Sequence, residues 1–272
     1  MKKKKSIVYD ALSPLGGNNN QEPLIKMITK AEIHKVKSLA DKRNRDELGL
    51  FVAEGEKIIR EIAASQLRVE RIYAIEGVME DVSGVVRVSK TEMERMSMLK
   101  SANNSLATVA VPRYRFDLAA AKSNLVLALD GIGNPGNVGT LIRLADWFGI
   151  TDVICSPSTA DCFNPKVVQA TMGAIIRVRV HCCDLAATLA EARSEGIPVY
   201  GTFLDGENIY DAPLGRSGII VMGSEGGGIS DEVARTVSHR LFIPPYPAGR
   251  RGSESLNVST AAAVVCSEFR RR

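Results

Sequence analysis

Three segments in the second half of the chain combine small or glycine residues with a few polar side chains. They are GlyIleGlyAsnProGlyAsnValGlyThrLeuIleArg at 131–143, ValMetGlySerGluGlyGlyGlyIle at 221–229 and SerGluSerLeuAsnValSerThrAlaAlaAlaValVal at 253–265. Each stands at the edge of an apolar stretch. Glycines let a backbone approach a ligand closely, and a few polar side chains can then be aimed at that ligand. The pattern predicts that three separated loops meet at a single pocket.

The first segment offers an asparagine and an arginine at the start of a predicted helix over 138–148. Asn137 is expected to cap this helix, where free backbone amides favour an anion or a polar substrate. Arg143 follows six residues later, between apolar neighbours that are expected to keep it out of bulk solvent. These two residues are therefore candidate polar groups of the predicted pocket.

The same segment also contains a GlyXxxGlyXxxXxxGly pattern, formed by Gly131, Gly133 and Gly136, between a strand and a helix. This pattern is typical of dinucleotide-binding domains. Two features argue against that reading here. Pro135 lies inside the predicted turn, and the next strand ends in CysSerPro at 155–157, where an acidic residue should hold the ribose.

The second and third segments each add a polar group to the predicted pocket. Glu225 is the single charged residue between Gly223 and Gly228, directly after an apolar strand over 219–222. Ligands of parallel sheets bind outside the carboxyl ends of the strands, which is where this loop is expected. In the third segment Ser255 is a good helix cap, but Asn257 would stand in the first helical turn, where asparagine is unfavourable. We therefore expect Asn257 to be functional.

Strands and helices alternate strictly from Asn124 onward. Apolar strands that alternate with helices predict an α/β fold with a parallel sheet covered on both faces. The expected strands are 125–129, 152–155, 175–180, 198–201, 219–222 and 240–243, and the expected helices are 138–148, 185–193 and three that begin near 164, 230 and 256.

The pattern of the first half of the chain predicts a smaller, separate α/β domain. ThrLysAlaGlu at 29–32 and SerLysThrGlu at 89–92 are capping boxes, and helices are expected after both and over 54–63. Strands are expected at 69–75, 85–88 and 107–111. We predict a disordered tail over 1–27, a first domain over 28–116 and a second domain over 117–272, with the linker within 112–123.

Composition narrows the class of protein. Residues 1–122 carry 22 Lys and Arg against 16 Asp and Glu, whereas residues 123–272 carry 13 against 15. A basic front half weakly favours a polyanionic partner. Neither the five cysteines nor the three histidines have zinc-site spacing, so no metal is expected. There is no apolar run of membrane-spanning length, and Asp10 and Pro14 interrupt any signal peptide, so a cytoplasmic protein without a membrane partner is expected.

In this order, the three segments resemble the motifs of the SpoU-type (TrmH-like) RNA ribose 2'-O-methyltransferases of the SPOUT superfamily. The resemblance implies S-adenosylmethionine as methyl donor, RNA as substrate with rRNA favoured over tRNA, a homodimer, and a C-terminal trefoil knot. It places beside the chemistry Asn137, Arg143, Glu225, Ser255 and Asn257. It assigns to the methyl donor Thr202, Met222, Gly223, Gly228, Ile243, Leu256 and Asn257.

Residues 28–111 look like the ribosomal-protein-like substrate domain of many members, through PheValAlaGluGlyGluLys at 51–57. Two places depart from the family pattern: the loop over 244–254 is longer, and LysSerAlaAsnAsnSer at 100–105 replaces a proline–glutamine turn. The proton acceptor is left open between Glu225 and water. The alternatives are a tRNA target, a non-catalytic RNA-binding protein and a nucleotide-dependent oxidoreductase.

Overall fold

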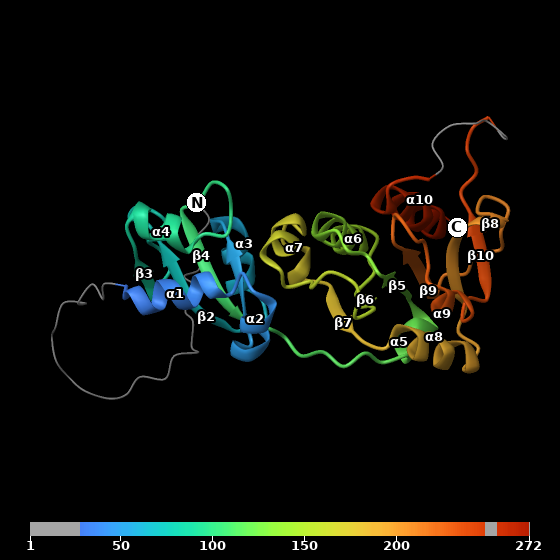
Figure 1. Ribbon diagram of the computed structural model, residues 1–272, viewed down its shortest axis with the longest axis horizontal. Coiled ribbons are helices and arrows are strands. Elements are labelled where there is room, and N and C mark those ends of the chain that lie inside the picture. Colours follow the sequence, from blue (N-terminus) through green and yellow to red (C-terminus); the bar gives the residue numbers. More distant parts are fainter. Residues whose placement is uncertain (1–27, 248–254, 272) are drawn as a thin grey trace, which may run out of the picture.

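The computed structural model describes residues 28–247 and 255–271, and within these ranges the chain forms two β-sheets with helices packed on them (Figure 1). The first sheet has four strands in the order β1-β4-β2-β3. The second has six strands in the order β10-β8-β9-β5-β6-β7, and every pair in it is parallel. The predicted α/β fold with a parallel sheet is confirmed. The predicted tail over 1–27 lies outside the described residues.

The first sheet belongs to the front half of the chain. Its strands are β1 (Leu50–Glu54), β2 (Val69–Ala74), β3 (Val85–Arg87) and β4 (Ser105–Ala110). Its helices are α1 (Lys30–Ser38), α2 (Lys42–Leu48), α3 (Glu56–Ala63) and α4 (Lys90–Met96). The sequence analysis did not predict α2 and β1. Asp41 caps α2, and Gly49 ends it in the left-handed conformation at φ 62°.

The two predicted capping boxes differ in the structure. Ser89 and Glu92 form the complete box at the start of α4. At α1, Thr29 accepts the backbone N–H of Glu32, but the Glu32 carboxylate accepts hydrogen bonds from Arg71 and Tyr73 instead of returning to Thr29. Only half of the box that was predicted there is therefore formed.

The second sheet belongs to the rear half. Its strands are β5 (Leu125–Asp130), β6 (Asp152–Cys155), β7 (Arg179–Cys182), β8 (Val199–Asn208), β9 (Gly218–Gly223) and β10 (His239–Phe242). Its helices are α5 (Ala119–Ser123), α6 (Pro135–Trp147), α7 (Pro165–Ala170), α8 (Leu185–Ser194), α9 (Asp231–Ala234) and α10 (Val258–Arg271). No helix in the described ranges combines the length and apolarity that a membrane crossing requires.

Alternate side chains of β5 point to opposite faces of the second sheet. Leu125, Leu127 and Leu129 join the hydrophobic core that α6, α7 and α10 cover, whereas Val126 and Ala128 join the core under α5, α8 and α9. The sheet is thus covered on both faces, as its apolar strands predicted.

Two expectations for this half are wrong. The predicted strand over 175–180 begins instead as a 3-10 turn, Ala174–Ile176, because Gly173 at φ 92° turns the chain, and β7 starts only at Arg179. The predicted linker over 112–123 ends early, because its last five residues form α5 and bury Ala121.

The two halves pack directly against each other, and α7 lies against β1 and beside α6 (Figure 1). The rings of Phe51 and Phe163 meet with their centroids 5.0 Å apart. Arg45, which is 2% exposed, forms an ion pair with Asp161 across the same boundary. These contacts join the front half to the second sheet.

Candidate active site

The helix that carries the first motif begins earlier than its sequence suggested. Asn134 is the cap of α6, because its side-chain oxygen accepts the backbone N–H groups of Gly136 (2.8 Å) and Asn137 (3.4 Å). Pro135 takes the first helical position, where its missing N–H costs nothing. The prediction that Asn137 caps this helix is therefore wrong. Its side chain is free for another use.

The second motif forms a tight loop at the carboxyl end of β9. Ser224 and Gly228 exchange two backbone hydrogen bonds of 2.9 Å each across it. A Cβ atom at Gly223 would lie 2.2 Å from the carbonyl carbon of Gly228, so only glycine fits there. The loop's own backbone, rather than a bound ligand, explains this glycine.

The third motif enters the site through Asn257. The side-chain oxygen of Asn257 accepts the backbone N–H groups of Ser259 (3.0 Å) and Thr260 (3.4 Å), as a helix cap does. The expectation that Asn257 lies inside the last helix, and Ser255 caps it, is wrong, because α10 starts at Val258. The cap uses only the oxygen of Asn257, and its amide nitrogen remains available.

One carboxylate joins all three motifs. Oε1 of Glu225 accepts a hydrogen bond from Nδ2 of Asn137 at 2.9 Å and another from Nδ2 of Asn257. The same Nδ2 of Asn257 lies 3.3 Å from Oδ1 of Asn137, and the Ser259 hydroxyl reaches the Asn137 carbonyl at 3.4 Å. We call Asn137, Glu225 and Asn257 the amide–carboxylate cluster. Glu225 and Asn257 are exposed to solvent and Asn137 is partly exposed, so a substrate can reach the cluster.

Two predicted catalytic residues stand apart from the amide–carboxylate cluster. Arg143 is exposed, and its guanidinium makes no hydrogen bond or ion pair within the described part of the chain. The six residues that separate it from Asn137 turn it about 120° around α6. Its neighbours Leu141 and Ile142 are buried on another face, so the expected shelter from solvent is absent. Ser255 is also exposed, close to the cluster only along the chain.

The residues predicted to contact a methyl donor lie at the carboxyl edge of β8, β9 and β10. Met222 is buried, and its sulfur lies 4.0 Å from the hydroxyl of Thr202 on β8. Ile243 directly follows β10 and is half-buried, whereas Leu256 is 49% exposed. Because parallel strands end at a common edge, these side chains stand on the same side of the sheet as the amide–carboxylate cluster.

A buried carboxylate that the sequence analysis missed supports this edge. Asp130 is the last residue of β5, is 5% exposed, and accepts the backbone N–H of Ser230 at 2.8 Å. Ser230 follows the glycine loop, so Asp130 fixes the loop's far end. An acidic residue at the end of an otherwise apolar strand, beside a predicted loop edge, was the available signal.

Comparison with known families matches both halves of the chain. Residues 124–267 match the SpoU rRNA methylase family, and residues 30–107 match the MRM3-like substrate binding domain. The first match covers more than half of the chain, including every element that builds the site. The chain belongs to the SpoU rRNA methylase family.

Relatives of this SpoU-family protein are similar over most of its length. The 23S rRNA (guanosine(2553)-2'-O)-methyltransferase RlmP of Bacillus subtilis is 28% identical over 90% of this chain and 100% of the relative. A Porphyromonas gingivalis protein assigned to the TrmH family of RNA methyltransferases is 39% identical, covers 90% of this chain and 99% of its own, and superposes with a TM-score of 0.82. An AdoMet-bound rRNA methyltransferase from Sinorhizobium meliloti is 25% identical over 89% of this chain and 95% of its own, with a TM-score of 0.79.

Metal ligands do not gather in this SpoU-family chain within 28–247 and 255–271. No group of three or more His, Cys, Asp or Glu side chains lies close enough together to hold an ion there. The functional groups of the site are amides, a carboxylate and glycine backbone.

Proposed function

We propose that this protein transfers a methyl group from S-adenosylmethionine to a ribose 2'-hydroxyl of ribosomal RNA, with 23S rRNA as the substrate. The amide–carboxylate cluster carries the proposal, because it brings one polar side chain from each of the three motifs to a single exposed point. The RlmP relative, matched over its whole length, is named for this reaction. We also propose that the protein acts in the cytoplasm, which a ribosomal RNA substrate supports.

The carboxyl edge fits the methyl donor by shape and polarity. A Cβ atom at Gly226 or Gly228 would meet no atom within 4 Å, so the loop leaves open space beside its backbone. Exposed Leu256 and half-buried Ile243 offer apolar surface to a flat purine ring. The residues that would hold the donor are Thr202, Met222, Gly223, Gly228, Ile243, Leu256 and Asn257.

Catalysis then depends on placing the ribose and accepting its proton. S-adenosylmethionine supplies a methyl group on a positively charged sulfur, which is already an activated leaving group. Two amide donors fix Oε1 of Glu225 and leave Oε2 without a hydrogen bond in the described part of the chain. We assign Oε2 as the acceptor of the 2'-hydroxyl proton, because an oriented carboxylate is suited to general-base catalysis.

Arg143 has a different role in this proposal. A guanidinium is effectively always protonated, so Arg143 cannot accept the proton. It instead holds the neighbouring phosphate and stabilises the negative charge that develops on the ribose oxygen. Asn137 and Asn257 orient Glu225.

A homodimer would supply Arg143 to the site of the second copy. Trp147, one turn after Arg143 on the same face of α6, is 83% exposed, which is unusual for so large an apolar side chain. We propose that this face packs against a second copy of the chain. Purified protein should then elute with the mass of a dimer in light scattering, and Trp147→Lys should elute as a monomer.

Two features of the architecture belong to the proposal. We assign residues 28–116 to RNA binding, supported by the MRM3-like match over 30–107, and residues 117–272 to catalysis. We also propose the trefoil knot, supported by the return of α10 from the sheet edge at β10 to pack on α6 and β9. An experimental density trace of 243–258 that passes outside the neighbouring loops would contradict the knot.

Substitution of Arg143 tests the proposed function. Arg143→Ala should reduce methyl transfer to 23S rRNA by about 100-fold or more, because one donor to the developing charge is lost. Calorimetry should find S-adenosylmethionine affinity within about twofold of the parent protein. Cofactor affinity that falls in step with activity would defeat the assignment of Arg143 to the RNA rather than to the donor.

A further inference from the structure

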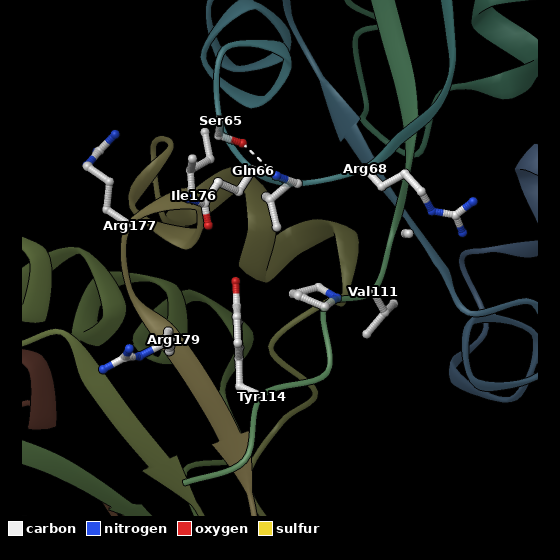
Figure 2. Close-up of a pocket in the computed structure, with 11 residues that line it drawn as sticks. Ser65, Gln66, Arg68, Val111, Tyr114, Ile176, Arg177 and Arg179 are labelled. Atoms are coloured by element: carbon white, nitrogen blue, oxygen red, sulfur yellow. Dashed lines mark hydrogen bonds between the residues drawn. The ribbon is translucent and has the colours of Figure 1, made fainter. Parts of the chain in front are cut away.

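An open cleft lies where the linker passes between the two halves of the molecule. It consists of two adjoining hollows of about 580 and 520 Å³ that share Tyr114 and Arg179 as lining residues. Figure 2 shows Tyr114 projecting from the linker into the space, with Arg177 and Arg179 on one side of it and Arg68 on the other. Neither hollow includes a residue of the amide–carboxylate cluster.

The cleft is lined by five arginines. In the described part of the chain, three of them form no ion pair or only a weak one. The lining arginines are Arg68, Arg113, Arg115, Arg177 and Arg179. Arg113 and Arg115 flank Tyr114, are exposed, and form no ion pair within the described residues. Arg68 is 75% exposed at its side chain and lies 3.8 Å from Glu70, a distance that gives little binding in water.

The carboxylates that line the cleft are already occupied. Asp152 accepts hydrogen bonds from Arg179 and His181, and although burial opposes ionisation, these bonds hold its pKa below the usual range. Asp117 accepts the backbone N–H of Ala119 at the start of α5. Asp117 keeps its negative charge, because a backbone N–H does not neutralise it, but Arg68, Arg113 and Arg115 outnumber it, so the cleft has an excess of positive charge.

Tyr114 is held as a rigid platform. Its ring meets the buried imidazole of His181 edge-on with centroids 6.0 Å apart, and the ring of Phe116 also lies against that imidazole, with centroids 5.3 Å apart. The ring is nevertheless 38% exposed. An aromatic ring that is fixed at its base, exposed on one side and flanked by free arginines is the arrangement that stacks an unpaired base beside its phosphates.

We propose that this linker cleft is a second RNA-contact site, which takes an unpaired segment of the substrate RNA by stacking a base on Tyr114 and binding phosphates with Arg113 and Arg115. The proposal rests on RNA as the substrate. The cleft is at the amino edge of the sheet, where Arg179 begins β7, whereas the amide–carboxylate cluster is at the carboxyl edge. The four residues of β6 separate the two edges by about 13 Å, so RNA in the cleft lies several nucleotides from the methylated ribose.

The contact can be measured as binding of a fluorescein-labelled, 12-nucleotide unpaired RNA and of a 23S rRNA transcript, without S-adenosylmethionine. Tyr114→Ala should weaken binding by about 5-fold to 100-fold, and Tyr114→Phe should restore it because stacking needs only the ring. Arg113→Gln with Arg115→Gln should lower the slope of log affinity against log salt by about 1.4, which corresponds to two phosphates of a single strand.

The matched control removes the same charge elsewhere. Arg216 and Arg235 are exposed and line neither hollow, so Arg216→Gln with Arg235→Gln should leave the salt slope unchanged. Thermal melting and calorimetry with S-adenosylmethionine establish that each variant is folded. Equal losses in the two arginine pairs, or Tyr114→Ala binding within twofold of the parent, would overturn the proposal.

These measurements distinguish failure of the cleft proposal from failure of the proposed function. RNA binding reports on the cleft, whereas donor binding and methyl transfer report on the carboxyl edge. A protein that binds RNA through Tyr114 but transfers no methyl group would keep the cleft and defeat the methyltransferase assignment. If the protein methylates RNA but its Tyr114 variants bind RNA with unchanged affinity, the methyltransferase assignment stands and the cleft proposal fails.

Discussion

At the scale of single residues, two asparagines hold Glu225, and one of them also caps a helix. Asn257 caps α10 with its oxygen and holds Glu225 with its nitrogen. Asn137 lies in the first turn of α6 because Asn134 and Pro135 start that helix, which leaves its amide free to hold the same carboxylate. An aspartate at position 137 or 257 would place a second negative charge beside Glu225.

Glu225→Gln tests the role of the carboxylate. The change keeps the size of the side chain and one oxygen for the two amides, but it removes the proton acceptor. Turnover should fall by about 100-fold or more, with donor affinity unchanged in calorimetry. Glu232→Gln, at an exposed carboxylate on α9, is the matched control and should keep full activity. Normal turnover of Glu225→Gln would assign proton acceptance to water.

Asn257→Asp tests separately the two roles of Asn257, which caps α10 with its oxygen and donates to Glu225 with its nitrogen. Aspartate caps helices as well as asparagine does, so the free energy of unfolding should stay within about 0.5 kcal/mol of the parent protein. Turnover should fall, because the donor to Glu225 is replaced by a second negative charge. Asn257→Ala should lose both functions and cost about 1 kcal/mol in urea unfolding. If Asn257→Asp kept full turnover, the amide would have no catalytic role.

The sequence predicted which side chains meet at the site better than it predicted their local geometry. Glu225 and Asn137 were found because a lone charge and an amide stand among glycines beside apolar strands. The start of α6 was misplaced, because Asn134 and Asn137 both stand near it and either satisfies the sequence rule for a cap. Contact between residues 120 positions apart, such as Asn137 and Asn257, depends on strand order, and local patterns do not contain strand order.

At the scale of elements, the loop after β9 positions Glu225. Its base is closed by Ser224 and Gly228, and its end is tied to β5 through Asp130. Strand β5 also leads into α6, so the same strand positions both Asn137 and the anchor of the Glu225 loop. The alternation of short apolar strands with helices predicted β5, α6 and β9, but not the anchor at Asp130. It did not predict α2 or the 3-10 turn before β7, where a polar seven-residue helix and a glycine decide the structure.

Gly223→Ala should open this loop. The added Cβ would lie 2.2 Å from backbone atoms of Gly228 and Ile229, which cannot move independently of the loop. We expect a loss of about 2–3 kcal/mol in stability and a clear loss of donor affinity. The control is Gly226→Ala, because a Cβ added there meets nothing within 4 Å. Its stability should be unchanged, and any loss of donor affinity would come from contact between the new methyl group and the donor. Unchanged stability of Gly223→Ala in urea unfolding would contradict the loop geometry.

At the scale of the whole molecule, a buried ion pair fixes the front half on the catalytic half. Arg45 also donates to the carbonyls of Leu39 and Ala40, so its position is set before it meets Asp161. The charge distribution of the sequence separated the two halves but gave no sign of this contact. If the front half binds RNA as proposed, this contact would present that RNA to the carboxyl edge of the second sheet in a constant orientation.

Asp161→Asn should weaken this boundary, because it leaves the buried guanidinium of Arg45 without its counter-charge. We expect a loss of about 2–3 kcal/mol in the free energy of unfolding and faster proteolysis of the linker. Asp46→Asn is the control, since its pair with Lys42 is 63% exposed on both sides and should contribute less than about 1 kcal/mol. Equal effects of the two substitutions would mean that the buried pair does not hold the halves together.

The most direct test of the account is to locate the transferred methyl group. Purified protein, radiolabelled S-adenosylmethionine and 23S rRNA from cells that lack the protein are incubated, and the RNA is hydrolysed in alkali. A methylated 2'-hydroxyl cannot attack the adjacent phosphate, so the account predicts label in alkali-resistant dinucleotides. It also predicts that Glu225→Gln and Arg143→Ala remove the label. Label in mononucleotides, which would place the methyl group on a base, would contradict the account.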